Sequence, residues 1–326
     1  MNRTLFRIAF VFLLAAGIAG VASAQVLPPV EAQAKARLAS SPRHGEWVSV
    51  PAGGGDKVET WVVYPERQDR APVVLVVHEI FGLTDWVRSV ADQLAAEGFI
   101  AVAPDLLSGK APGGKGSEAV DSDTAVRLVS ALDPKEIVRR LNAVASYATK
   151  LPAATGKFGV VGFCWGGGIS FLYATEQPKL GASVVFYGVS PATDALARIK
   201  APVLGLYGGD DARIGATVPA AQAEMKRLGK RYEVESYAGA GHAFMRQQDA
   251  RAGANLRAAE QAWPRAVEFL RQALEAQVSL AGPQALQAKA SLTGPQALPA
   301  ALSTEPVTCT CGAEETAGAS IAQAGD

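Results

Sequence analysis

Cysteine, histidine and methionine are scarce in this chain, with three residues of each among 326. Three cysteines are too few, and odd in number, for the disulfide framework that holds small exported domains together. Only His44, His78 and His242 are available for imidazole chemistry. The fold must therefore depend on a hydrophobic core, and any histidine-dependent site can be traced through three positions.

Net charge is also absent, because 31 basic residues balance 31 acidic ones. Proteins that bind nucleic acid concentrate positive charge on one face or in a tail. No such field is visible in the sequence. We therefore expect no nucleic-acid partner.

The first 24 residues resemble an export signal. They combine a positively charged start, an apolar run from Ile8 to Val21 and the small-residue cleavage motif Ala-Ser-Ala at 22–24. Two glycines interrupt the apolar run, which argues against a stable membrane span, although an uncleaved anchor is the alternative. The expectation is a signal peptide over 1–24 and a protein that is exported to the periplasm or secreted.

The remaining chain divides by composition into three parts. Residues 25–45 are polar and alanine-rich and are predicted to be an N-terminal leader. Residues 46–276 are long enough for one large α/β domain. Residues 277–326 are low in complexity, since the segment 279–286 returns almost unchanged at 291–298, and we expect a disordered tail.

Within the central part, predicted strands alternate with predicted helices. The expected strands are Glu46–Val50, Val58–Tyr64, Val73–Val77, Phe99–Ala103, Phe158–Val161, Ala182–Tyr187, Val203–Tyr207 and Tyr232–Tyr237. The expected helices are Trp86–Glu97, one or two between 119 and 150, one from Cys164 to about Thr175, Thr217–Leu228 and about Asn255–Ala276. This order predicts a mostly parallel, doubly wound sheet with helices on both faces and a ligand site at the carboxyl ends of the strands.

One motif at such a strand end carries a cysteine. The sequence at 162–167 is GFCWGG, directly after a predicted strand and before a predicted helix. A sharp strand-to-helix turn of this kind needs glycines beside the nucleophile, since no β-carbon fits in the tightly packed bend. Cys164 therefore occupies the place of a nucleophile. The alternative interpretation is a buried thiol without a chemical role.

A cysteine nucleophile needs a base and a group that orients the base. His242 lies in a glycine-rich loop after the last predicted strand, and Asp211 follows the strand before it. Asp210 competes for the orienting role, and Asp211 is favoured because it lies three residues after Gly208. The order nucleophile, acid, histidine is that of α/β-hydrolases. His44 is interpreted as an ordinary surface histidine.

Two metal or phosphate motifs are rejected. The segment HEIFG at 78–82 begins like a zinc motif, but glycine stands where the second histidine is needed. The segment 109–115 is similar to a phosphate loop, but Gly116 stands where Ser or Thr would bind magnesium. We therefore expect neither a metal nor a cofactor.

Taken together, these segments resemble the dienelactone hydrolases (carboxymethylenebutenolidases), α/β-hydrolases with a Cys-Asp-His triad. The resemblance spans about residues 45 to 275. It rests on the combination of HEIFG at 78–82, PDL at 104–106, GFCWGG at 162–167, GGDD at 208–211 and GHAF at 241–244.

The resemblance implies an α/β-hydrolase fold and a role for each matching residue. Cys164 is the expected nucleophile, His242 the base and Asp211 its orienter. The backbone amides of Ile80 and Trp165 are the expected oxyanion donors.

Three further residues are implied around this triad. Glu79 matches the family's glutamate beside the thiol, where a negative charge opposes thiolate formation. Arg246 matches one of two arginines that hold the substrate carboxylate. Gly109 stands at the second arginine position, with Lys110 next to it, and Lys110 lacks the planar fork that binds a carboxylate bidentately.

The sequence thus predicts a hydrolase of lactones or small activated esters that forms an acyl-thioester on Cys164. The expected partner is a small ester or lactone, with an anionic one allowed by Arg246. Two alternatives are a non-catalytic ligand-binding protein on the same fold, and a redox thiol protein that pairs Cys164 with Cys309 or Cys311.

Overall fold

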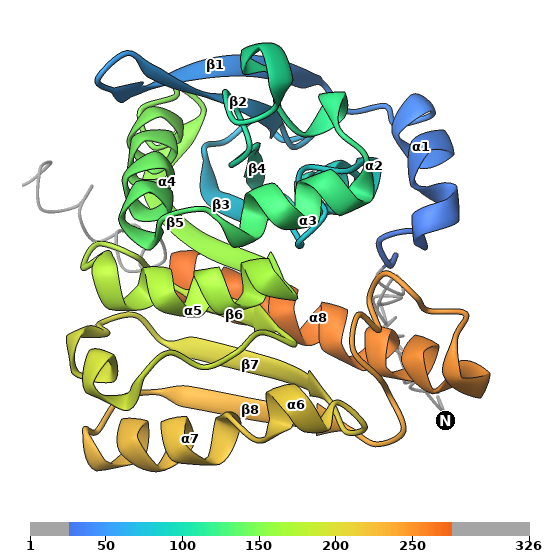
Figure 1. Cartoon of the computed structure of the whole chain (residues 1–326), viewed down its shortest axis with the longest axis vertical. Helices are drawn as coiled ribbons and strands as arrows, with labels where there is room; N and C mark the ends of the chain where they lie inside the picture. The colour runs from blue at the N-terminus through green and yellow to red at the C-terminus, as the bar shows by residue number, and fades with distance from the viewer. Residues whose placement is uncertain (1–25, 276–326) are drawn as a thin grey trace, which may run out of the picture. The chain divides into compact units, whose positions relative to one another are not determined.

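The computed structural model describes residues 26–275 (Figure 1). The predicted signal peptide at 1–24 and the predicted tail at 277–326, with Cys309 and Cys311, lie outside the described residues.

The described strands form one eight-stranded sheet in the order β1-β2-β4-β3-β5-β6-β7-β8. Strands β1 to β2 and β2 to β4 pair antiparallel, and every other neighbouring pair is parallel. The strands are β1 (Gly45–Gly53), β2 (Asp56–Val63), β3 (Ala71–Val77), β4 (Ile100–Pro104), β5 (Ala154–Phe163), β6 (Ser183–Phe186), β7 (Val203–Gly208) and β8 (Tyr232–Tyr237). Each predicted strand is present, so the α/β prediction is confirmed.

The helices cover both faces of this sheet (Figure 1). They are α1 (Glu31–Ala39), α2 (Asp85–Ala96), α3 (Ser122–Ser130), α4 (Pro134–Ala148), α5 (Trp165–Glu176), α6 (Ala212–Gly215), α7 (Val218–Arg227) and α8 (Ala254–Glu275). Short 3-10 turns lie at 112–114, 117–119, 193–198 and 251–253. The region predicted as one or two helices, between 119 and 150, contains α3 and α4, which are separate because Asp133 and Pro134 start a new helix.

Strand β3 shows how the sequence creates two hydrophobic cores. All seven of its residues are buried. Val74 and Val76 belong to the core that contains α2 and α8, whereas Val73, Leu75 and Val77 belong to the core that contains α4 and α5. Side chains of a strand alternate between faces, so an uninterrupted apolar run fits only a strand covered on both sides.

The segment predicted as a leader contains a packed helix. Helix α1 lies against α2, and Ala34 is fully buried. Arg37 donates to Gln93 at 3.0 Å, and Arg43 binds both carboxylate oxygens of Asp92 at 3.0 and 2.6 Å. Residues 31–43 are therefore part of the folded unit.

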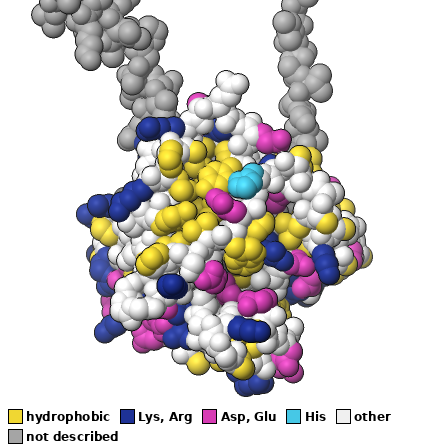
Figure 2. Space-filling view, turned by 90° about the horizontal axis from the view of Figure 1, so that it is seen from above, with side chains coloured by type: hydrophobic (Ala, Val, Ile, Leu, Met, Phe, Trp, Pro, Cys, Tyr) yellow, Lys and Arg dark blue, Asp and Glu magenta, His cyan; other side chains and the backbone are white. Residues whose placement is uncertain are grey.

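The surface carries charges of both signs. Figure 2 shows basic and acidic side chains interspersed on one face, around a group of apolar ones. Among residues 26–275 there is no helix with the length and apolar character needed to cross a membrane.

Candidate active site

The turn between β5 and α5 holds Cys164 in a strained conformation. Its φ is 55° and its ψ is −118°, values that a residue with a β-carbon rarely adopts. The backbone N–H of Cys164 donates to Phe186 O at 3.1 Å, which ties the turn to β6. Such an elbow presents the side chain at the carboxyl end of the sheet.

Two glycines make this turn sterically feasible. A β-carbon on Gly162 would lie 1.9 Å from the carbonyl oxygen of Gly166, and one on Gly166 would lie 2.3 Å from that of His78. Both clashes are with backbone, which cannot rotate away. The glycines predicted around the nucleophile therefore let α5 start directly against the ends of β3 and β5.

The backbone amides of Ile80 and Trp165 both interact with the thiol of Cys164. Each lowers its pKa through a hydrogen bond. The fully buried side chain of His78 contacts both segments that carry these amides. Its Nδ1 donates to Glu79 O at 2.7 Å, and its ring stacks on that of Trp165 at 5.4 Å. The two amides predicted as oxyanion donors thus converge on one point.

Around the sulfur, the environment opposes ionisation. Burial, and next the charge of Glu79, raise the pKa of the Cys164 thiol to about 11. Only about one thiol in ten thousand is ionised near pH 7 at such a value. The resting thiol therefore needs a base or a change in its surroundings before it can attack.

Glu79 is a buried carboxyl with incomplete partners. Burial raises its pKa to about 7, against the opposing effect of Arg246. Its Oε2 lies 2.7 Å from Arg246 Nε, but without the alignment of a hydrogen bond, and its Oε1 has no hydrogen-bond partner. Near neutral pH this group can therefore be charged or neutral.

His242 and Asp211 form the second half of the predicted triad. His242 Nδ1 lies 2.5 Å from Asp211 Oδ2, whereas Asp210 instead pairs with Arg251 at 2.9 Å. Because Nδ1–H donates a hydrogen bond to Asp211, His242 Nε2 is left as the basic nitrogen. Among the described residues, no hydrogen bond joins His242 to Cys164.

Tyr187 bridges the two halves of the site. It is fully buried at the end of β6, and its ring meets that of His242 edge-on at 5.1 Å. Burial raises its pKa well above the ordinary value, and the charges of Glu79 and then Cys164 raise it further. Its hydroxyl has no hydrogen-bond partner.

Neither of the two cations predicted to bind substrate is free of protein partners. Lys110 lies 2.7 Å from Glu136, beside Arg140 on α4, and is not among the residues that line the cavity described below. Its role as a substrate ligand stays a prediction. Arg246 does line the pocket, between Glu79 and Glu31.

Sequence reasoning missed Tyr187, Arg213 and Glu31. Arg213, on α6, lowers the pKa of the Cys164 thiol through its charge. Its position two residues after Asp211 was the available signal. Tyr187 ends a predicted strand, and that position is itself a signal of a site residue. Glu31 lies in the predicted leader, where no pattern in the sequence indicated a site residue.

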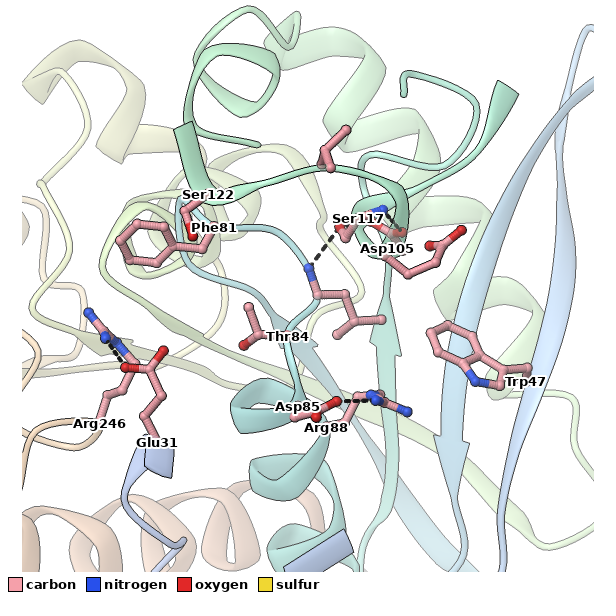
Figure 3. A pocket seen from close by; sticks show the side chains of 13 residues that line it. Glu31, Trp47, Phe81, Thr84, Asp85, Arg88, Asp105, Ser117, Ser122 and Arg246 are labelled. Carbon is pink, nitrogen blue, oxygen red and sulfur yellow. Dashed lines mark hydrogen bonds and ion pairs between the residues drawn. The ribbon is translucent and has the colours of Figure 1, made fainter. Parts of the chain in front are cut away.

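A cavity of about 510 Å³ adjoins this cluster (Figure 3). Figure 3 shows Arg246 and Glu31 paired at one side of it and Trp47 at the other. Phe81 lines it and lies under the Arg246 guanidinium at 5.2 Å. Cys164, Asp211 and His242 are not among its lining residues, so Arg246 connects the cavity to the thiol environment through Glu79.

No group of three or more His, Cys, Asp or Glu side chains within 26–275 is arranged to hold a metal ion. Cys164 is a free thiol.

Replacing Glu79 with glutamine should make Cys164 react at lower pH. Ionised Glu79 raises the thiol pKa, so its removal increases the thiolate fraction, tenfold for each pKa unit. At pH 8 we expect several-fold faster alkylation of Cys164 by iodoacetamide, measured by mass spectrometry. The difference should fade below about pH 6, where Glu79 of the wild type is itself protonated. Equal rates at pH 8 would mean that Glu79 does not govern the thiol.

Comparison with known proteins gives a consistent result. Residues 58–274 match the Dienelactone hydrolase family. A Salmonella typhimurium protein named "Putative carboxymethylenebutenolidase" is 34% identical over 237 residues, covering 69% of this chain and 86% of that protein. Its namesake from Escherichia coli K12 is 33% identical over 239 residues, with 69% and 86% coverage.

Among solved structures, a "Putative Dienelactone Hydrolase" from Klebsiella pneumoniae has a TM-score of 0.62 and 32% identity. It covers 71% of this chain and 99% of its own. The similarity therefore includes nearly the whole of that solved chain.

Proposed function

Because this chain belongs to the dienelactone hydrolase family and has its α/β-hydrolase fold, we propose that it hydrolyses lactones or small activated carboxylic esters through Cys164. The observation that carries this proposal is the convergence on one sulfur of a strained elbow and two backbone amides. An imidazole already held by a carboxylate contacts the ring of Tyr187, and the charge of Cys164 raises the pKa of that same tyrosine.

The first half-reaction transfers the acyl group to sulfur. His242 Nε2 accepts the thiol proton, and the sulfur attacks the carbonyl carbon of the ester. The carbonyl oxygen, now negative, accepts hydrogen bonds from the amides of Ile80 and Trp165. Collapse of this intermediate breaks the C–O bond, and the protonated His242 returns its proton to the leaving alcohol.

The second half-reaction restores the thiol. His242 removes a proton from water, the resulting hydroxide attacks the thioester carbon, and the sulfur leaves with a proton from His242. In a lactone the alcohol and the acid stay joined, so one product is released. Asp211 holds the imidazole in the required tautomer in both halves.

The resting arrangement must change slightly before this chemistry. The amides of Ile80 and Trp165 bear on the sulfur itself, and no hydrogen bond links it to His242. We propose that a bound carbonyl oxygen takes over the two amides while the sulfur rotates toward His242. This change would also move the thiol away from the charge of Glu79, which favours the thiolate.

The proposal is tested by comparing matched acyl compounds. A thiolate is a better leaving group than an amide nitrogen, so the intermediate formed from an amide reverts rather than breaking down to product. We expect hydrolysis of p-nitrophenyl acetate and of simple lactones, and no measurable hydrolysis of acetyl-p-nitroanilide. Prior alkylation of Cys164 should abolish the ester activity. Ester hydrolysis that persists after complete alkylation would contradict the proposal.

A further inference from the structure

Two protein carboxylates already lie beside the guanidinium of Arg246. Its Nη1 lies 2.6 Å from Glu31 Oε2, its Nε lies 2.7 Å from Glu79 Oε2, and Phe81 covers one face. A carboxylate is bound best by two parallel N–H groups of one edge. Nη1 already donates to Glu31, and the carboxylate of Glu79 lies beside Nε, so a substrate carboxylate would have to displace Glu31 or lie next to two protein carboxylates.

The first of these partners is built into the fold. Glu31 begins α1, and its backbone N–H donates to Arg246 O at 3.2 Å, so backbone and side chain both join the two residues. The preceding prolines are anchored as well: Gln248 donates to Pro28 O at 2.8 Å, and Trp86 donates to Pro29 O at 3.0 Å. The entropy cost of placing the Glu31 carboxylate is part of folding. A free ligand would still lose that entropy on binding, so Glu31 has the advantage at this position.

The cavity beside Arg246 has an excess of carboxylates. Its charged lining residues are Glu31, Asp85, Asp105 and Glu118 against Arg88 and Arg246. Arg88 is paired with Asp85 and lies over the rings of Trp47 and Trp61. These carboxylates would repel a negatively charged substrate group that entered the cavity. An uncharged group could instead pack against Trp47, Phe81, Leu83 and Val120.

We propose that Glu31 fills the carboxylate-binding position of the site, so that this protein takes uncharged esters in preference to carboxylate-bearing ones. The inference rests on the proposed reaction at Cys164 and names its substrate class. Glu31 is thus a specificity-determining residue contributed by the N-terminal segment.

The test uses two alkylating agents of similar size, uncharged iodoacetamide and anionic iodoacetate, on the full chain. Labelling is measured on the peptide that carries Cys164, so that Cys309 and Cys311 do not contribute. Rates are divided by those of free cysteine. We expect wild type to disfavour iodoacetate, and Glu31→Gln to raise the iodoacetate rate about fivefold, an ordinary effect for one partly exposed ion pair. The iodoacetamide rate of the same variant is the baseline, because a change in the thiol itself alters both rates and cancels in their ratio.

Glu224→Gln is the matched control. It also removes a carboxylate from an arginine pair, on α7, and should leave the ratio unchanged. Glu31→Asp, which keeps the charge, should retain most of the discrimination. Equal normalised rates for the two agents in wild type, or an unchanged ratio in Glu31→Gln, would overturn the inference.

Hydrolysis separates this inference from the proposed function. A lactone carrying a free carboxylate and its methyl ester are compared for kcat/KM. We expect wild type to prefer the methyl ester and Glu31→Gln to narrow the gap. Ester hydrolysis with no charge preference would overturn the inference and leave the proposed function intact. Charge-selective alkylation without any ester hydrolysis would overturn the proposed function and leave the role of Glu31.

Discussion

Replacing Cys164 with alanine is expected to lower kcat/KM for p-nitrophenyl acetate by at least about a thousandfold. Alanine keeps the β-carbon and therefore the same backbone strain at the elbow, but no atom remains that can form the acyl-enzyme. The amides of Ile80 and Trp165 could still polarise a bound carbonyl, so the residual rate should lie above that of water alone. Stopped-flow or steady-state release of p-nitrophenol measures the effect.

Serine at position 164 is the companion variant. It keeps a hydrogen-bonding group near the shape of the thiol, but its hydroxyl ionises far less readily, so activity should also fall strongly. Thermal unfolding midpoints close to that of wild type would show that both variants fold. A folded alanine variant with wild-type kcat/KM would remove Cys164 from the chemistry.

Replacing His242 with asparagine should reduce kcat/KM about a hundredfold to ten thousandfold, the usual range for a positioned base. With a thiol pKa of about 11, almost no thiolate is present near neutral pH. Loss of the base should therefore slow the attack of the sulfur on the ester carbonyl. The activity of the variant should keep rising with pH toward the thiol pKa of about 11, because hydroxide then replaces the imidazole in removing the thiol proton.

His44 provides the matched control for this variant. It is an exposed histidine that stacks on Tyr64 and lies near Glu46. His44→Asn should keep kcat/KM within about twofold of wild type, as expected of a surface change. If both histidine variants behave alike, His242 is not the base.

The fold was largely predictable because β3 and its parallel neighbours are continuous apolar runs. Such runs fit only strands buried on both faces, and the intervening amphipathic segments fit only covering helices. Helix α1 was missed for the opposite reason. Only Ala34 of its nine residues is buried, so its apolar pattern is weak, and it is held by contacts such as Arg37 to Gln93 that lie far apart in the sequence.

The candidate site was predictable to the extent that its chemistry is local. The glycines around Cys164 and the loop that holds His242 are visible as short motifs. The partners of Arg246 and Lys110 are not, because Glu31 lies 215 residues from Arg246, and Lys110 meets Glu136 on α4, with α3 between them in the chain. Sequence can identify a cation for a substrate, but only packing decides whether that cation is already neutralised.

The central claim is that Cys164 carries the acyl group during turnover. The most direct measurement is mass spectrometry of the full chain quenched in acid during hydrolysis of p-nitrophenyl acetate, followed by mapping of the modified peptide. The account predicts one acetyl group on the peptide that contains Cys164, present during turnover, lost when substrate is exhausted, and absent from Cys164→Ala. Steady turnover with the acetyl group on another residue, or with Cys164 unmodified throughout, would contradict it.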